Sequence, residues 1–272
     1  MATAPASVTL DTGLTLSYAT HGETSGTAVL LLPGPTDSWR SYEPVLELMP
    51  LGIRAIAVSQ RGHGESDKPA TGYRVEDFAA DIAPLLDALG LEQAVLAGHS
   101  GSCLAARRAA IDRPDRVAGL VLEASPTTLK ADPRLTAFVE TVVARLEDPI
   151  DPAFARSVVV ETSSDEVTPE TLDDLVDELL KVPARVWRET FAGLLRYDDL
   201  EDLPRITKPT LLLWGDADRL VGREMQEELL RRLADATLVT YPGLGHTPRW
   251  EDPPQFAADV TAFVERSAGS TP

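Results

Sequence analysis

The chain has 272 residues, and its 43% of hydrophobic residues excludes intrinsic disorder. Its formal net charge of −18 argues against nucleic acid or an anionic membrane surface as partner, since both are bound through basic patches. No apolar run approaches the ~20 residues that span a bilayer, and residues 1–10 have no basic residue or long apolar core, so we expect a cytoplasmic protein without a secretory signal. Cys103 is the only cysteine, which excludes an internal disulfide and a cysteine-rich zinc site.

The first elements are two short segments, residues 8–10 and 14–18, which an Asp-Thr-Gly turn joins into a predicted antiparallel hairpin. Near-continuous apolar runs then predict strands that are buried on both faces of a parallel sheet. These runs cover residues 28–32, 53–58, 94–97, 117–122 and 210–214. Amphipathic helical patterns occur between or after them, at residues 75–89, 104–111 and 256–264. This alternation predicts an α/β fold with a mostly parallel central sheet and helices on both faces.

The alternation stops between residues 129 and 204, where only helical patterns occur. The apolar stripes of these helices cover residues 135–146, 172–180 and 187–195. The second helix is expected to begin with Thr168 as N-cap and Pro169 at the first helical position. We interpret this insertion as a helical lid over the end of the sheet.

Two domains follow from this interpretation. Residues 1–128 and 205–272 form the core domain, and residues 129–204 form the lid. The lid carries 18 acidic and 8 basic residues, either as a solvated surface or as a charged border of the entrance to a site.

A serine stands between a predicted strand and a predicted helix, in the stretch Ala97-Gly-His-Ser-Gly-Ser-Cys103. A nucleophilic serine at such a sharp turn needs small residues two positions before and after it, and Gly98 and Ser102 meet that need. The turn would place the Ser100 hydroxyl at the amino end of a helix, whose free amides favour negative charge. The alternative is a plain N-cap serine, and the position between strand and helix favours a nucleophile.

A nucleophilic serine needs a base and an acid that orients the base. Of the four histidines, His246 is favoured because it follows the apolar run 237–241, and α/β sheets gather functional groups at the carboxyl ends of strands. The turn after another predicted strand offers two acids, Asp216 and Asp218.

Five stretches resemble motifs of the α/β-hydrolase superfamily, in its branch of lidded esterases and lactonases. In chain order they are Leu31-Leu-Pro-Gly-Pro-Thr-Asp-Ser-Trp39, Gln60-Arg-Gly-His-Gly-Glu-Ser66, the turn around Ser100, Trp214-Gly-Asp-Ala-Asp218 and Gly245-His246. The resemblance covers nearly the whole chain and implies the α/β-hydrolase fold with the triad Ser100, Asp218 and His246. The family's Gly-Asp-x-Asp turn favours Asp218 over Asp216, which would instead accept turn amides. Glu123 occupies a place where some members put the acid.

The resemblance also implies an oxyanion hole made by two backbone amides, and here the sequence departs from the family pattern. The usual loop begins His-Gly-x, and the amide of x is one donor, but Pro35 stands at x and has no N–H group. The amide of Gly101 remains as the first donor. Thr36 is the candidate for the second, through its hydroxyl or its amide; otherwise the hole is half-formed. Ser102 replaces a common glycine.

Other residues carry weaker signals. Trp39, Trp187 and Trp250 line an apolar acyl pocket or belong to the core, and Cys103 is expected to be a buried packing residue. No dinucleotide or phosphate loop occurs, and the histidines and acids lack metal-ligand spacing. The sequence therefore implies no cofactor and no metal ion.

The serine at the nucleophile position excludes the aspartate chemistry of dehalogenases and epoxide hydrolases in this superfamily. The resemblance implies a cofactor-independent serine hydrolase that cleaves a small, neutral, apolar carboxylic ester or lactone through an acyl-enzyme. Two alternatives keep the triad: perhydrolase or haloperoxidase chemistry, and hydrolysis of a carbon–carbon bond. A third, suggested by Pro35, is a ligand-binding protein on a hydrolase scaffold.

Overall fold

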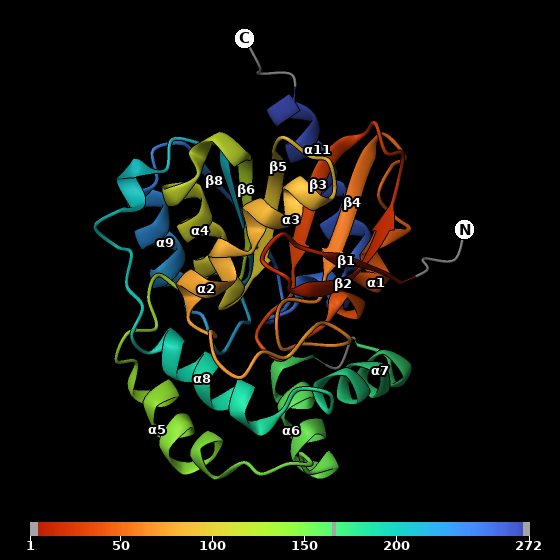
Figure 1. Ribbon diagram of the computed structural model, residues 1–272. Helices are drawn as coiled ribbons and strands as arrows, with labels where there is room; N and C mark the ends of the chain where they lie inside the picture. The colour runs from red at the N-terminus through yellow and green to blue at the C-terminus, as the bar shows by residue number, and fades with distance from the viewer. Residues whose placement is uncertain (1–4, 165–166, 269–272) are drawn as a thin grey trace.

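The computed structural model describes residues 5–164 and 167–268. Within these residues, eight strands form one sheet in the order β1-β2-β4-β3-β5-β6-β7-β8 (Figure 1). The strands are β1 (Ala6–Thr9), β2 (Thr15–His21), β3 (Thr27–Leu32), β4 (Ile53–Val58), β5 (Ala94–His99), β6 (Val117–Glu123), β7 (Thr210–Gly215) and β8 (Ala236–Tyr241). The pairs β1–β2 and β2–β4 are antiparallel, and the other pairs are parallel. The predicted hairpin and parallel sheet are confirmed.

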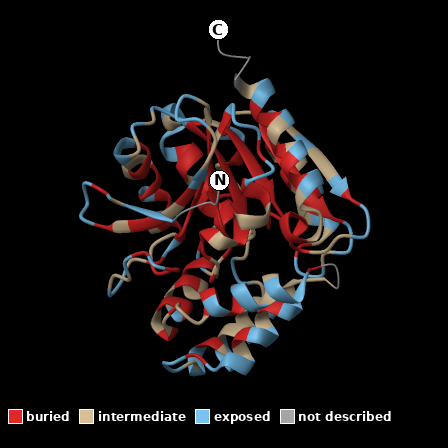
Figure 2. Ribbon diagram, turned by 90° about the vertical axis from the view of Figure 1, so that its right-hand side faces the viewer, coloured by how far each residue is buried: buried red, intermediate tan, exposed pale blue. Residues whose placement is uncertain are grey.

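Helices cover both faces of this sheet, which is why its inner strands are continuous apolar runs. On β3, Leu30 and Leu32 pack into the core beneath α4, whereas Val29 and Leu31 pack on the opposite side, towards α11. The core helices are α1 (Glu43–Leu46), α2 (Val75–Ala80), α3 (Ile82–Ala88), α4 (Ser102–Asp112), α9 (Arg223–Arg232), α10 (Pro248–Glu251) and α11 (Pro253–Ala268). Short 3₁₀ turns are η1 (Trp39–Tyr42), η2 (Pro114–Arg116) and η4 (Leu203–Arg205). Figure 2 shows the buried sheet between helices whose outer sides are exposed.

The strand order reverses at β3, which pairs with β4 on one side and β5 on the other. In open α/β sheets, ligands bind outside the carboxyl ends of the strands at such a point. The loop after β3 carries Pro35 and Thr36, and the turn after β5 carries Ser100. The topology therefore brings these two segments together before any side-chain contact is considered.

The segment from 129 to 204 forms a layer of helices below the carboxyl edge of the sheet in Figure 1. It contains α5 (Pro133–Thr141), η3 (Val143–Arg145), α6 (Pro152–Thr162), α7 (Pro169–Leu179) and α8 (Ala184–Leu194). The start of α7 is as predicted, since the Thr168 hydroxyl accepts from the Thr171 amide at 3.2 Å. The helix α6 was not anticipated. It begins with the carboxylate of Asp151, which accepts from the Ala153 amide.

The helical pattern at residues 75–89 forms two helices, α2 and α3, that meet at Asp81. Pro84 explains the break, because it has no N–H group to donate to the carbonyl four residues earlier. None of the helices in the described ranges is both long enough and apolar enough to cross a membrane.

Candidate active site

Ser100 lies in a strained turn directly after β5. Its φ of 51° is in the left-handed region, which non-glycine residues seldom adopt. Its amide donates to the Glu123 carbonyl at 2.9 Å and so ties the turn to β6. A Cβ atom on Gly98 would lie 3.0 Å from the backbone of Cys103, so the turn requires glycine two positions before the serine. This is the geometry that the sequence predicted for a nucleophile.

Asp218 and His246 are joined by a hydrogen bond. The Nδ1 atom of His246 donates to Oδ2 of Asp218 at 2.8 Å, and the carboxylate is fully buried. Its other oxygen accepts from the amides of Leu220 and Val221 at 2.8 and 3.0 Å. Because the carboxylate only accepts, the proton of a neutral imidazole is on Nδ1, and Nε2 is left as a proton acceptor.

The two other candidate acids are engaged elsewhere. Asp216 is exposed, and its Oδ1 accepts from the Gly243 amide at 2.6 Å, which is the turn contact expected of it. Glu123 is buried and accepts from the backbone amide and the Nη1 atom of Arg249 at 3.1 and 3.2 Å. Only Asp218 of the three acids contacts the imidazole of His246 in the described part of the chain.

The loop that carries His246 is held by two residues that the sequence analysis did not identify. The carboxylate of Glu251 accepts from the amides of Gly245 and Thr247 at 2.7 and 3.0 Å. The Nε2 atom of His99 donates to the carbonyl of His246 at 3.0 Å. A carboxylate five residues after His246 was a visible signal for the first contact, whereas the second depends on the tertiary fold.

His99 also links the serine turn to the loop after β3. Its ring centre is 4.9 Å from that of His246, and its Nδ1 atom would be 2.6 Å from a Cβ atom on Gly34. The ring therefore occupies the space that only glycine leaves free at position 34. Burial, with the nearby charges of Arg249 and His246, lowers the pKa of His99 well below its usual range, so this side chain is a neutral spacer and not a base.

The loop after β3 makes a tight turn from Gly34 to Asp37. The amide of Asp37 donates to the carbonyl of Gly34 at 3.1 Å, with Pro35 and Thr36 as the central residues. Thr36 has a φ of 79°, as in a type II turn, where glycine is usual. For a β-branched residue this conformation costs ~1–3 kcal/mol. Neither the amide nor the hydroxyl of Thr36 has a hydrogen-bond partner among the described residues.

The turn packs directly against the residue that follows Ser100. A Cβ atom on Gly101 would lie 2.8 Å from Cγ of Pro35 and 3.2 Å from the nearer methyl group of Leu194 on α8. Glycine at position 101 therefore lets the proline ring and α8 approach the serine turn. The amide of Gly101 remains a backbone donor at this position.

Ser102, where the family commonly has glycine, also holds this loop. Its hydroxyl donates to the carbonyl of Pro33 at 2.6 Å. The side-chain amide of Gln60 donates to the same carbonyl at 3.0 Å and to the Ser102 hydroxyl at 2.9 Å. Ser102 is therefore in contact with the loop that carries the other departure from the family pattern, Pro35.

A buried cluster of charges lies beneath the three loops. Arg249 has no exposed surface, and its guanidinium donates to Asp37, Glu123 and the hydroxyl of Ser41. It also lies over the rings of Tyr42 and Trp250, at 5.2 and 4.4 Å. Burial raises the pKa of Asp37 and of Glu123, although Arg249 partly offsets this effect.

Cys103 is a packing residue, as expected. The side chain is fully buried in the first turn of α4, and its thiol donates to the Gly98 carbonyl at 3.1 Å. Burial raises the pKa of the Cys103 thiol to about 12. Because thiolate is the reactive form of cysteine, the thiol is unreactive in the folded chain.

The three tryptophans of interest are buried, and each packs within the core. Trp39 lies on the face covered by α11, and Trp250 donates from Nε1 to the Ser41 carbonyl at 2.8 Å. Trp187 stacks on Phe191 at 5.5 Å within the helical segment.

Across residues 5–164 and 167–268, no three histidine, cysteine, aspartate or glutamate side chains are grouped so that they could hold a metal ion.

A family model described as the alpha/beta hydrolase family matches residues 29–260. The chain therefore belongs to the α/β-hydrolase family, and it is an enzyme of that superfamily. It is 31% identical to a non-heme chloroperoxidase of Streptomyces lividans, over 95% of this chain and 99% of that protein. It is 30% identical to a 2-(acetamidomethylene)succinate hydrolase of Mesorhizobium japonicum, over 93% and 92%.

Solved structures agree with this family. An esterase from a Rhodococcus species has 26% sequence identity and a TM-score of 0.84, over 97% of this chain and 99% of that one. An esterase of Thermogutta terrifontis superposes with a TM-score of 0.86 at 24% identity, over 97% of this chain and 99% of that one. At 24% identity, the likeness to the Thermogutta terrifontis esterase shows a shared fold.

Proposed function

We propose that the protein is a serine hydrolase that cleaves a small carboxylic ester or lactone, with Ser100 as nucleophile, His246 as base and Asp218 as the acid that orients the base. The observation that carries this proposal is the 2.8 Å contact between Nδ1 of His246 and Oδ2 of Asp218. The left-handed backbone of Ser100 supports it, as does the 3.0 Å hydrogen bond from His99, the residue before Ser100, to the His246 carbonyl. In the proposed reaction, Nε2 of the neutral imidazole accepts the serine proton.

The reaction follows from these roles. Nε2 of His246 takes the Ser100 proton as Oγ bonds to the substrate carbonyl carbon, and the carbonyl oxygen becomes an oxyanion. When the tetrahedral intermediate collapses, the ester bond breaks and the leaving alkoxide takes the proton from His246. A water molecule, deprotonated by the same imidazole, then attacks the acyl-enzyme and releases the acid. Asp218 stabilises the imidazolium formed in each half.

The oxyanion needs donors, and we assign the first to the amide of Gly101. For the second we propose Thr36, because Pro35 has no N–H group and both donors of Thr36 lack a partner among the described residues. The tight turn from Gly34 to Asp37 supports this role, since it holds Thr36 in a single strained conformation. Preorganised donors lower the barrier because they need no rearrangement as charge develops.

We further propose that residues 129–204 act as the lid of this site. Leu194 on α8 is in contact distance of the Gly101 position, and α7 packs on η1, which follows the proposed oxyanion loop. Substrate would therefore be enclosed between these helices and the carboxyl ends of the strands. A neutral, small substrate suits the apolar side chains around the serine turn.

Fluorophosphonate labelling tests the central assignment. We expect the reagent to form a covalent bond to Ser100 with loss of fluoride, detected as a mass increase on the intact chain. Ser100→Ala should remove both labelling and ester turnover, with the melting temperature within a few degrees of the parent. Ser157→Ala, on the exposed side of α6, is the matched control. Labelling that persists in Ser100→Ala would refute the nucleophile, and a chain that takes no label would point to a binding protein.

Perhydrolysis is a second candidate, favoured by the likeness to a chloroperoxidase over 95% of this chain. In that reaction hydrogen peroxide replaces water and attacks the acyl-enzyme, so that a peracid is released. Product analysis of ester reactions with and without peroxide separates the two activities. If the yield of peracid is far above the yield of free acid in the reaction with peroxide, perhydrolysis is favoured.

A further inference from the structure

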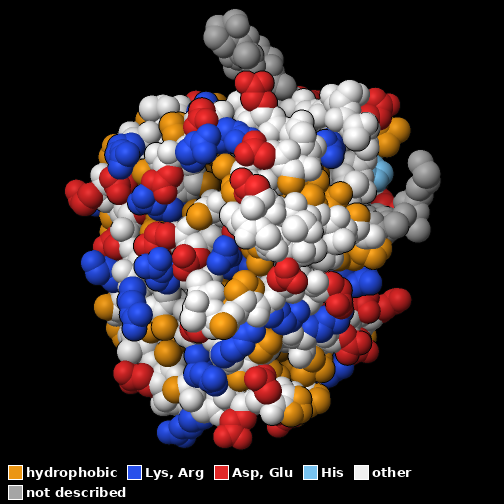
Figure 3. All heavy atoms as spheres, viewed as in Figure 1, with side chains coloured by type: hydrophobic (Ala, Val, Ile, Leu, Met, Phe, Trp, Pro, Cys, Tyr) orange, Lys and Arg blue, Asp and Glu red, His pale blue; other side chains and the backbone are white. Residues whose placement is uncertain are grey.

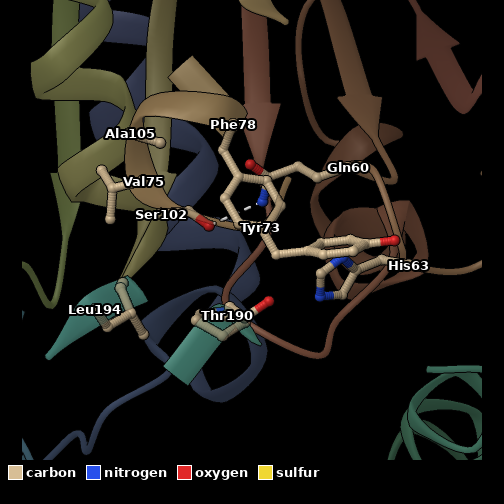
Figure 4. Close-up of a pocket in the computed structure, with 11 residues that line it drawn as sticks. Gln60, His63, Tyr73, Val75, Phe78, Ser102, Ala105, Thr190 and Leu194 are labelled. Carbon is tan, nitrogen blue, oxygen red and sulfur yellow. Dashed lines mark hydrogen bonds between the residues drawn. The ribbon is translucent and has the colours of Figure 1, made fainter. Parts of the chain in front are cut away.

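A small cavity lies beside the serine turn, between the core and α8 (Figure 4). Its volume is about 10 Å³, which is room for about one water-sized group. Its walls include Pro35 and Gly101 from the serine site, Leu194 and Thr190 from α8, and His63 from the loop after β4. The other side chains around it, such as Tyr73, Val75 and Phe78, are mostly apolar.

Two polar atoms in this wall are buried without a hydrogen-bond partner: Nε2 of His63 and the hydroxyl of Thr190. The two side chains are 1% and 5% exposed. They face one another across the cavity in Figure 4. The other polar side chains of the wall are already paired, because Gln60 donates to Ser102. Since buried polar atoms without partners are costly, such a pair points to a polar group that enters between them.

The protonation of His63 defines what that group must be. Nδ1 lies 2.8 Å from the carbonyl of Arg61, and a carbonyl oxygen only accepts, so the proton is on Nδ1. Burial lowers the pKa of His63 to about 4, and the ring is neutral near neutral pH. Nε2 is therefore an acceptor that requires a donor, whereas the Thr190 hydroxyl both donates and accepts.

We propose that this cavity is the acyl-side subsite of the enzyme and that it selects short acyl groups that end in a hydroxyl group. The acyl hydroxyl donates to Nε2 of His63 and accepts from the hydroxyl of Thr190. The inference rests on the proposed serine hydrolase function. Pro35 and Gly101 belong both to the cavity wall and to the proposed oxyanion hole, and Gly101 directly follows Ser100, so the cavity adjoins the place proposed for the acyl group.

The size of the cavity sets the length of the acyl group. Room for about one water-sized group admits the terminal hydroxyl of a glycolyl group but no long chain. Ethyl glycolate and ethyl propionate form an isosteric pair, since a hydroxyl in one replaces a methyl group in the other. The ratio of their kcat/KM values, corrected for the rates of alkaline hydrolysis, isolates the hydrogen bonds of the subsite.

We expect the corrected ratio to favour glycolate by on the order of 10-fold in the parent enzyme, because propionate leaves the two polar atoms unpaired. Thr190→Val keeps the shape but deletes the hydroxyl, and it should bring the ratio to within about twofold of unity. Thr190→Ser should keep the preference. Thr141→Val makes the same change on α5, where the side chain is exposed, and should leave the ratio unchanged.

The outcomes separate this inference from the proposed function. A parent enzyme that hydrolyses both esters without preference, or a Thr190→Val enzyme that keeps the preference, overturns the subsite. A lower melting temperature of Thr190→Val with an unchanged ratio also overturns it, because the pair then holds only a structural water. If the parent hydrolyses neither ester and Ser100 takes no fluorophosphonate, the hydrolase itself is refuted and the subsite with it.

Discussion

The guanidinium of Arg249 donates to the carboxylate of Asp37 at 3.0 Å, and this contact joins the loop of His246 to the loop of Thr36. The same side chain binds Glu123 at the end of β6. One buried arginine therefore connects three strand ends around the proposed triad. Its two carboxylate partners have no cation other than Arg249 within salt-bridge distance among the described residues.

Arg249→Met should destabilise the fold strongly, because it leaves the buried carboxylates of Asp37 and Glu123 without their cation. Removal of one partner from a buried ion pair costs ~3–5 kcal/mol. Urea unfolding followed by circular dichroism measures the loss. Arg223→Met removes an exposed pair with Glu227 and should change the free energy of unfolding by less than about 1 kcal/mol. Equal effects of the two substitutions would contradict a supporting role for Arg249.

The loss in free energy of unfolding that Arg249→Met causes should depend on pH. Burial raises the pKa of Asp37 and Glu123 above the ordinary values, and loss of the guanidinium raises them further. When the pKa of a carboxyl is higher in the folded than in the unfolded state, its contribution to stability is fully present below the unfolded-state pKa. That contribution is lost as the pH rises through the folded-state pKa. The variant should therefore be less destabilised at about pH 5 than at about pH 8. A deficit of equal size at both values would show that the carboxylates are not its cause.

Asp218→Asn should lower kcat by on the order of 10⁴, because the amide neither fixes the tautomer of His246 nor stabilises the imidazolium. Asp216→Asn is the matched control. Asp216 is exposed, and asparagine keeps an oxygen for the Gly243 amide, so kcat should stay within about twofold. Steady-state kinetics with a chromogenic ester give both values. A larger loss in Asp216→Asn would mean that the acid has been assigned to the wrong aspartate.

Thr36→Val tests the second oxyanion donor. If the hydroxyl is that donor, kcat should fall ~10²-fold, as for other oxyanion donors, with little change in KM. An unchanged kcat would leave the amide of Thr36 or a half-formed hole. Pro35→Ala then separates these two, because it restores a backbone N–H group at the family's usual position. A faster Pro35→Ala enzyme would indicate a half-formed hole and would favour the non-hydrolytic alternatives.

The acidic segment from Glu161 to Glu178 should slow the reaction of anionic substrates if it borders the entrance. Asp165 and Glu166 lie outside the described residues, and Glu178 is buried against Arg40 and Lys181. Among the described acids, Glu178 therefore does not belong to an exposed acidic surface, and Lys, Arg, Asp and Glu are interspersed over the face seen in Figure 3.

Neutral esters should still react faster than carboxylate-bearing analogues, by a margin that shrinks as salt rises. The double substitution of Asp174 and Asp177, both exposed on α7, by asparagine should narrow the margin at low salt. Equal rates of the two substrates at low salt would mean that the segment is only a solvated surface.

The strands could be predicted because a parallel strand buried on both faces is a continuous apolar run. The run 53–58 coincides with β4, which spans Ile53–Val58. The proposed triad could be predicted for a related reason, since Ser100 and Asp218 each follow such a run and His246 follows the edge strand β8. The break between α2 and α3 was also visible in principle, at Pro84, but apolar periodicity concealed it.

Contacts between distant residues could not be predicted in this way. Arg249 and Glu123 are charged, and charged residues are seldom fully buried. Their pairing depends on the adjacent ends of strands that are far apart in sequence. The same holds for His63 and Thr190, whose unpaired atoms line one cavity only after α8 has packed on the core. Periodicity predicts which face of an element is buried, but not which element it faces.

The buried thiol of Cys103 allows an assay that requires no knowledge of the substrate. With a pKa of about 12, only ~10⁻⁵ of this thiol is ionised near pH 7, and alkylation must await an opening of the segment between β5 and α4. Because the chain has no other cysteine, the alkylation rate of the unmodified protein measures that opening. A compound that binds beside Ser100 stabilises the closed state and should protect Cys103 in proportion to its affinity, so that candidate substrates can be ranked by alkylation rate before any product is known.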